Sequence, residues 1–131
     1  MSGERIARLP RLAFVTEAEP FDISTVAPDT GVSVVRVRGE LDQATSPALE
    51  EALTQAPAGE SVVLDLTDCS FMDSSAIRVV LACAKHVESG GGAMSLVVPA
   101  AGVLRALEIA NVEARVPIHP SVEAATTETS T

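Results

Sequence analysis

The hydroxyl groups of Ser74 and Ser75 follow the carboxylate of Asp73 at the start of a predicted helix. The first turn of a helix has unsatisfied N–H groups and the positive end of the helix dipole, so a phosphate on either serine would not melt it. The same Asp-Ser-Ser triplet is also an ordinary helix cap, and its spacing alone favours the capping interpretation. The triplet therefore predicts a helix start, with a phosphate acceptor as the second hypothesis.

Residues for nucleophilic catalysis or nucleotide binding do not accompany these serines. His86 comes 12 residues after Ser74 on the same predicted helix, which places it about 18 Å away along the axis. His119 is flanked by proline, and neither histidine has a catalytic motif around it. The glycine run at 90–92 lacks the lysine and the following helix that a phosphate-binding loop requires. We therefore expect that the protein is not an enzyme and binds no cofactor.

Cysteine content and charge argue against a disulfide-rich, zinc-binding or nucleic-acid-binding protein. Cys69 and Cys83 are too few for a disulfide framework and lack zinc-ligand spacing, so we expect two buried, inert thiols and no metal site. With 18 acidic and 9 basic residues, the net charge of -9 would repel nucleic acid and anionic lipid. No apolar run approaches the length of a membrane span, and the first residues do not resemble a signal peptide. These observations predict a cytoplasmic protein and leave its oligomeric state open.

Apolar residues at strand and helix spacing divide the 131-residue chain into alternating elements. Strands are expected at 12–16, 33–38, 61–66, 93–98 and 116–118. Helices are expected from Ser46 to about residue 57, from Ser74 to the glycine run, at 103–110 and as a last turn at 120–121. Residues 17–31 have the composition of turns, the strand at 33–38 stops at Gly39, and a loop carries Asp68 and Cys69. Alternating strands and helices pair in parallel, and an N-terminal hairpin adds an antiparallel edge, so the fold class is α/β with a mixed sheet.

Two motifs resemble a known family. Residues 35–42 read VRVRGELD and residues 71–75 read FMDSS, in this order with a predicted helix between them. Over roughly residues 30–125 the chain is similar to the STAS domain, the sulphate transporter and anti-sigma factor antagonist fold. The resemblance implies a mixed sheet of four to five strands with three to four α-helices. We accordingly expect a flexible N-terminus at 1–11, a single STAS domain at 12–125 and a disordered tail at 126–131.

The resemblance also implies a function, that of an anti-sigma factor antagonist acting by partner switching. In bacterial antagonists the first serine of the triplet, here Ser74, accepts the phosphate, and Asp42 and Asp73 match acidic positions implicated in kinase recognition. The implied partners are an anti-sigma factor serine kinase of the histidine-kinase-like ATPase fold, which supplies ATP and magnesium, and a metal-dependent serine phosphatase. The candidate partner-binding residues are Gly39, Glu40, Asp42, Asp73, Ser74, Ser75 and Arg78.

The sequence departs from the family pattern directly after the triplet. The family usually continues Gly-Leu-Gly, whereas this chain has Ala76, Ile77 and Arg78, so that a cation stands one turn from Ser74. Alanine suits a helix better than glycine. A second interpretation is a non-catalytic STAS adaptor subunit of a stress-signalling scaffold or of a lipid-transport ABC complex. The sequence does not name the sigma factor, the kinase or the stimulus.

Overall fold

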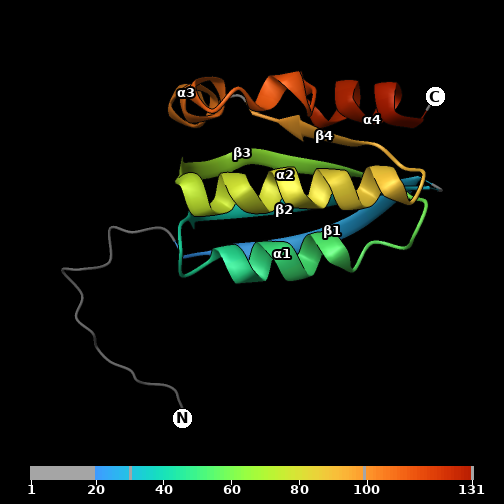
Figure 1. Cartoon of the computed structure of the whole chain (residues 1–131), viewed down its shortest axis with the longest axis horizontal. Helices are drawn as coiled ribbons and strands as arrows, with labels where there is room; N and C mark the ends of the chain where they lie inside the picture. The colour runs from blue at the N-terminus through green and yellow to red at the C-terminus, as the bar shows by residue number, and fades with distance from the viewer. Residues whose placement is uncertain (1–19, 30, 99, 131) are drawn as a thin grey trace, which may run out of the picture.

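The computed structural model describes residues 20–29, 31–98 and 100–130 (Figure 1). Within them it has five strands, four α-helices and one short 3-10 helix. In chain order these are β1 (Asp22–Asp29), β2 (Val32–Leu41), α1 (Ser46–Thr54), β3 (Ser61–Met72), α2 (Ser74–Ser89), β4 (Met94–Val97), α3 (Ala101–Ile109), η2 (Val112–Ala114), β5 (Ile118–His119) and α4 (Val122–Ser130). The numbers of strands and helices agree with the expected STAS-like α/β fold.

The five strands form one mixed sheet in the order β1-β2-β3-β4-β5. β1 pairs with β2 antiparallel, and the remaining neighbours pair in parallel, so the sheet is mixed as expected, although the antiparallel strand lies within the segment expected to be turns. The carboxyl ends of parallel strands lie at the same edge of a sheet. The ends of β2 and β3, which carry the two motifs, are therefore neighbours, with Leu41 opposite Met72.

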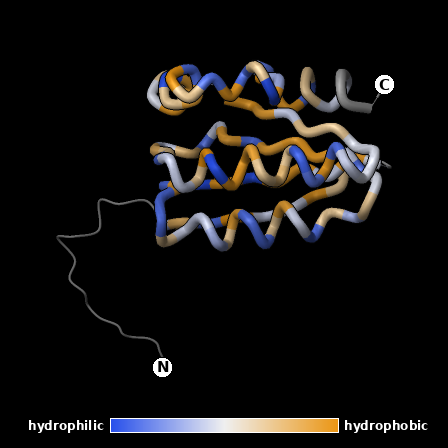
Figure 2. Tube along the Cα trace, in the orientation of Figure 1, coloured by the Kyte–Doolittle hydropathy of each residue, from blue (hydrophilic) through white to orange (hydrophobic). Residues whose placement is uncertain are grey.

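Helices cover the sheet on both faces (Figure 1). The larger core contains buried residues of α1, α2 and α3, among them Leu49, Val80 and Leu107, against the sheet. A smaller core on the other face packs Ala125 of α4 against Val63 and its neighbours. Hydrophobic residues dominate the central strands, while hydrophilic and hydrophobic residues alternate along α1 and α2, as expected for helices with one buried side (Figure 2).

The helix that follows Asp73 forms where the sequence predicts it. Five residues of α2 are buried: Ala76, Val80, Cys83, Ala84 and Val87. Their spacing gives one apolar stripe along the helix. Gly90 is its C-cap, so the glycine run ends the helix as expected. In β3, Val62–Leu66 are all buried, as befits a central strand covered on both faces.

Three predictions in the N-terminal half are wrong. Residues 17–31, expected to be turns, contain β1, an edge strand whose mostly exposed side chains give little alternation and which tolerates Pro28. β2 does not stop at Gly39 but continues to Leu41. β3 runs through the expected loop at residues 68–69, because two irregularities in its pairing with β2 absorb one additional residue each. The strand expected at 12–16 lies outside the described residues.

The C-terminal end also differs from the prediction. Instead of one turn and a disordered tail at 126–131, α4 extends from Val122 to Ser130. Val122 and Ala125 pack on the second face of the sheet, and the Ser121 hydroxyl accepts the Ala124 N–H at 3.1 Å. This burial compensates for the low apolar content of the segment. The last strand lies at residues 118–119, two residues after its expected start at 116.

We predict that Gly39→Ala destabilises the protein. Gly39 has a φ of 98°, and an added Cβ would lie 3.1 Å from Phe21 Cα and 3.2 Å from Pro20 O. Since neither backbone atom belongs to a flexible side chain, the loss should be about 1–3 kcal/mol in urea denaturation. Gly102→Ala on α3 is the matched control, because its Cβ would meet nothing within 4 Å and alanine favours a helix by up to about 1 kcal/mol. Equal stability of the two variants would contradict this explanation of Gly39.

Candidate functional site

The two sequence motifs meet at the carboxyl edge of the sheet. The Asp73 N–H donates to the Leu41 carbonyl at 3.0 Å, which joins the start of α2 to the end of β2. Asp42 and Asp73 therefore begin the connections that leave two adjacent strands. The spatial proximity of these segments, which are some thirty residues apart in the sequence, follows from the parallel pairing of β2 and β3.

Asp73 is the N-cap of α2. Its backbone is extended, and its Oδ1 accepts the N–H of Ser75 at 2.9 Å and that of Ala76 at 3.3 Å. The Ser75 hydroxyl donates to the same oxygen at 2.5 Å. That hydroxyl is the main reason why the pKa of Asp73 lies below its ordinary value, and backbone N–H groups of Ala76, Ser75 and Gln43 act in the same direction against the effect of burial. The capping interpretation of the triplet is thus confirmed.

Asp42 orders the turn between β2 and α1. Its Oδ1 accepts the N–H of Ala44 at 2.9 Å and that of Thr45 at 3.1 Å. The Thr45 hydroxyl donates to the Glu40 carbonyl at 2.9 Å, which closes the turn on itself. Thr45, rather than Ser46, is the N-cap position of α1, and its side chain does not cap the helix.

A pair of hydroxyl groups connects the two helix starts. Ser46 Oγ lies 3.1 Å from Ser75 Oγ and 2.7 Å from the Asp42 carbonyl oxygen. Ser46 is buried and Ser75 is half-buried. The Ser75 hydroxyl is therefore held between Asp73 and Ser46, in the interior of the site.

Ser74 has the opposite environment. It is exposed at the first position of α2, and its hydroxyl makes no hydrogen bond within the described part of the chain. Phosphoryl transfer needs an acceptor oxygen that a second protein can reach. Of the two hydroxyls, the one on Ser74 is accessible and the one on Ser75 is engaged.

The remaining candidates divide into surface and interior positions. Glu40 and Arg78 are exposed, and Asp42 and Asp73 are half-buried. Gly39 is buried, so its place in the motif is explained by its backbone conformation. Of the residues predicted to bind a partner, Gly39 is therefore one that fixes the backbone and does not itself contact a partner.

Phe71 is a surface residue that sequence reasoning missed. It is 48% exposed, one of three exposed large hydrophobic residues in the described segments, the others being Val26 and Ile109. In the sheet it lies opposite the exposed Glu40, three residues before Ser74. Strand alternation gave no signal for this exposure, because Ser70 and Phe71 are both exposed between the buried Cys69 and Met72.

The cysteines have structural positions. Cys69 and Cys83 are both buried, and Cys69 Sγ lies 3.2 Å from the Phe71 carbonyl. Burial, with a smaller contribution from Glu50, raises the pKa of Cys83 to about 11, so its reactive thiolate form is scarce at neutral pH. Among the described residues no cluster of His, Cys, Asp or Glu could hold a metal ion.

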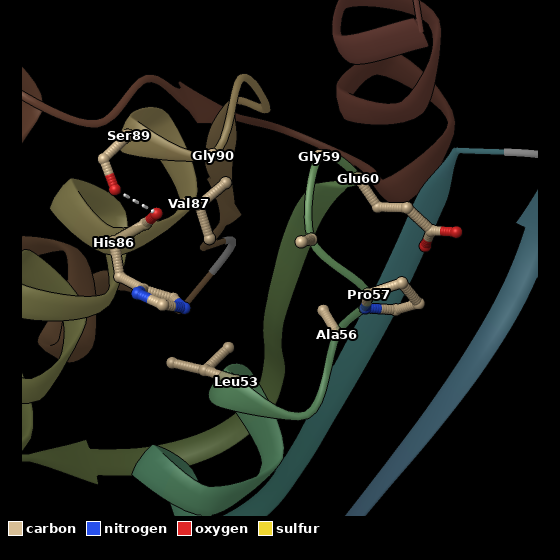
Figure 3. A pocket seen from close by; sticks show the side chains of 10 residues that line it. Leu53, Ala56, Pro57, Gly59, Glu60, His86, Val87, Ser89 and Gly90 are labelled. Atoms are coloured by element: carbon tan, nitrogen blue, oxygen red, sulfur yellow. Dashed lines mark hydrogen bonds between the residues drawn. The ribbon is translucent and has the colours of Figure 1, made fainter.

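A small cavity of about 90 Å³ lies at the other end of α2 (Figure 3). Leu53 and Ala56, from the end of α1 and the turn after it, face His86 and Val87 across it. His86 is exposed and lies 12 residues beyond Ser74, about 18 Å along the helix. The cavity is therefore separate from the site at the carboxyl edge.

Comparison with known proteins identifies the family. The sequence model of the STAS domain matches residues 25–125. The chain belongs to the STAS domain family. An anti-sigma F factor antagonist from Paenibacillus polymyxa is 34% identical over 102 residues, which are 75% of this chain and 86% of that relative.

Solved structures of STAS proteins have the same fold. The crystal structure of an anti-sigma factor antagonist from Mycobacterium paratuberculosis superposes with a TM-score of 0.75 at 26% identity, over 84% of this chain and 96% of that one. The phosphorylated form of the Bacillus cell fate determinant SpoIIAA superposes with a TM-score of 0.62 at 19% identity, over 81% and 98% of the two chains. The chain thus groups with the anti-sigma factor antagonists, which are non-catalytic regulators. In the described segments of this STAS domain, no helix has the length and apolar character needed to cross a membrane.

We predict that Asp73→Ala lowers the urea midpoint at pH 7, whereas Asp73→Asn retains most of it, because asparagine also caps helices through its side-chain oxygen. The folded-state pKa of Asp73 lies below its ordinary value. The ionised carboxylate therefore stabilises the fold above about pH 4, and this contribution is lost as the pH falls through the folded-state pKa. The difference in urea midpoint between wild type and Asp73→Ala should therefore be smaller at pH 3 than at pH 7. A gap that is independent of pH would show that the cap does not depend on the charge.

Proposed function

We propose that the chain is an anti-sigma factor antagonist that works by partner switching, with Ser74 as its phosphate acceptor. The unphosphorylated protein binds an anti-sigma factor, and phosphorylation of Ser74 releases it. The observation that supports this assignment is the contrast between the two serines, since the hydroxyl of Ser74 is exposed and that of Ser75 is held by Asp73 and Ser46. A cytoplasmic location and a single domain over residues 12–125 complete the proposal.

The chemistry of the switch belongs to the partners. In the forward step Ser74 Oγ attacks the γ-phosphorus of ATP, the bond to the β-phosphate oxygen breaks, ADP leaves, and the hydroxyl proton passes to a base of the kinase. The kinase is an anti-sigma factor of the histidine-kinase-like ATPase fold. In the reverse step a metal-dependent serine phosphatase directs water onto the phosphorus and restores the hydroxyl.

The effect of the phosphate on binding follows from the charges already present. A phosphoserine carries about -1.5 to -2 charge at neutral pH. At Ser74 it would adjoin Asp73 and lie at the same sheet edge as Glu40. A docked partner would have to desolvate this concentrated negative charge, which costs several kcal/mol and lowers affinity by about a thousandfold or more. The phosphate itself is compatible with the helix start, so the fold is retained.

Phe71 gives the same surface an apolar contact. Its exposed ring stands beside Glu40 in the pairing of β2 and β3, on a chain with a net charge of -9. Aromatic side chains are enriched at the centres of interfaces, and opposite charges around them set orientation and association rate. The partner surface that fits is an apolar pocket with a basic rim.

We predict that the cognate kinase and ATP place one phosphate on Ser74. Ser74→Ala should abolish labelling and bind the kinase constitutively, and Ser74→Glu should lose at least about a hundredfold in affinity because a charge replaces the hydroxyl. Both variants should melt within a few degrees of wild type. Ser75→Ala is the control and should still be labelled. Labelling that disappears in Ser75→Ala and persists in Ser74→Ala would refute the assignment, and co-purification with a permease and its ATPase in place of a kinase would support the adaptor alternative.

We predict that Phe71→Ala weakens binding of the unphosphorylated protein by about tenfold to a hundredfold, because truncation of an interfacial aromatic residue costs about 1–3 kcal/mol. Ile109→Ala is the matched control, since Ile109 is 75% exposed on α3, outside both motifs. It should leave the affinity unchanged. Titration calorimetry with the kinase, alongside melting curves of both variants, measures the difference. Equal affinities for Phe71→Ala and wild type would remove Phe71 from the interface.

A further inference from the structure

Arg78 is an exposed cation without a carboxylate partner in the described part of the chain. On a helix the residues three and four positions away are the neighbours of a side chain. For Arg78 these neighbours are Ser74, Ser75, Leu81 and Ala82, and none of them is acidic. Two other arginines of this acidic chain do form ion pairs: Arg36 lies 3.3 Å from Asp65, and Arg115 lies 3.1 Å from Glu88.

Helix geometry directs Arg78 toward Ser74. The two residues are four positions apart in α2, so they lie on one face, about 6 Å apart along the axis. Side chains of a helix lean toward its N-terminus, which brings the guanidinium over the preceding turn. The planar fork of five N–H donors matches two phosphate oxygens at once. A phosphate on Ser74 would lie within reach of this fork.

The other charged groups near Ser74 oppose a phosphate. Asp73 precedes it, and Asp42 and Glu40 lie at the end of the adjacent strand. Asp73 Oδ1 is occupied by N–H and hydroxyl donors from the first turn of α2, so that carboxylate already has its own partners. Arg78 is therefore the cation on α2 that is placed to balance a new negative charge at position 74.

We propose that Arg78 is the internal counter-ion of phosphorylated Ser74. This inference depends on the proposed function only for the identity of the acceptor. The ion pair prolongs the phosphorylated state, because hydrolysis requires water to attack the phosphorus, the bond to Ser74 Oγ to break and inorganic phosphate to leave. A phosphatase has to displace the guanidinium before its own metal ions can engage the phosphate oxygens.

Phosphorus NMR of the full chain tests the ion pair without any partner. Phosphoserine is installed at position 74 during synthesis by genetic encoding, and the phosphorus shift is followed between pH 4 and pH 8. Arg78 favours the dianion, so it lowers the second pKa of the phosphate from its usual value near 6. Arg78→Gln should raise the midpoint by about 0.3 pH units or more. Arg78→Lys should restore part of the difference, because it keeps the charge and loses the fork.

Arg105→Gln is the matched control. Arg105 is exposed on α3, and its removal changes the net charge by the same amount. It should leave the midpoint at the wild-type value. The proposal is overturned if the phosphate of Arg78→Gln titrates at the wild-type midpoint. It is also overturned if Arg105→Gln shifts the midpoint by as much as Arg78→Gln does. Because no kinase is involved, failure of enzymatic labelling at Ser74 would refute the proposed function and leave this result standing.

Discussion

The parallel pairing of β2 with β3 is the constraint on which the site depends. It places the ends of two strands side by side and allows the Asp73 N–H to donate to the Leu41 carbonyl. From there the chain turns from β2 into α1 and from β3 into α2, and each turn is ordered by an aspartate, Asp42 or Asp73. Near the end of β2 the backbone adopts a positive φ at Gly39, a conformation that residues with a side chain adopt only with strain. The two motifs are thus one structural unit, although they are separated in sequence.

Within this unit the two serines have different roles. Ser75 ties the start of α2 to Ser46 of α1, and it lowers the pKa of the capping carboxylate. Ser74 stands outside that network and is free to change its charge. A modification at Ser74 can therefore alter the surface while the hydrogen bonds that hold the unit stay in place. This separation is the reason why we propose a switch that acts through charge at an interface and leaves the fold unchanged.

Much of this arrangement can be predicted from the sequence. The helix after Asp73, its end at the glycine run and the mixed sheet follow from apolar spacing and capping residues. β1 and the extension of β3 could not be predicted, because an exposed edge strand has weak alternation and pairing irregularities depend on the neighbouring strand. Phe71 was missed for the same reason, since its exposure depends on where β3 ends. The hydroxyl pair between Ser46 and Ser75 joins residues 29 positions apart and has no local signal.

The central claim is that Ser74 carries the regulatory phosphate in the living cell. Mass spectrometry of the chain isolated from its native host, with fragmentation that localises phosphate within the peptide containing the Asp-Ser-Ser triplet, tests it most directly. We expect a fraction of molecules with one phosphate on Ser74 and none on Ser75, and a change in that fraction between growth conditions. Phosphate confined to Ser75, or its absence from the triplet under every condition in which the chain is expressed, would contradict the account.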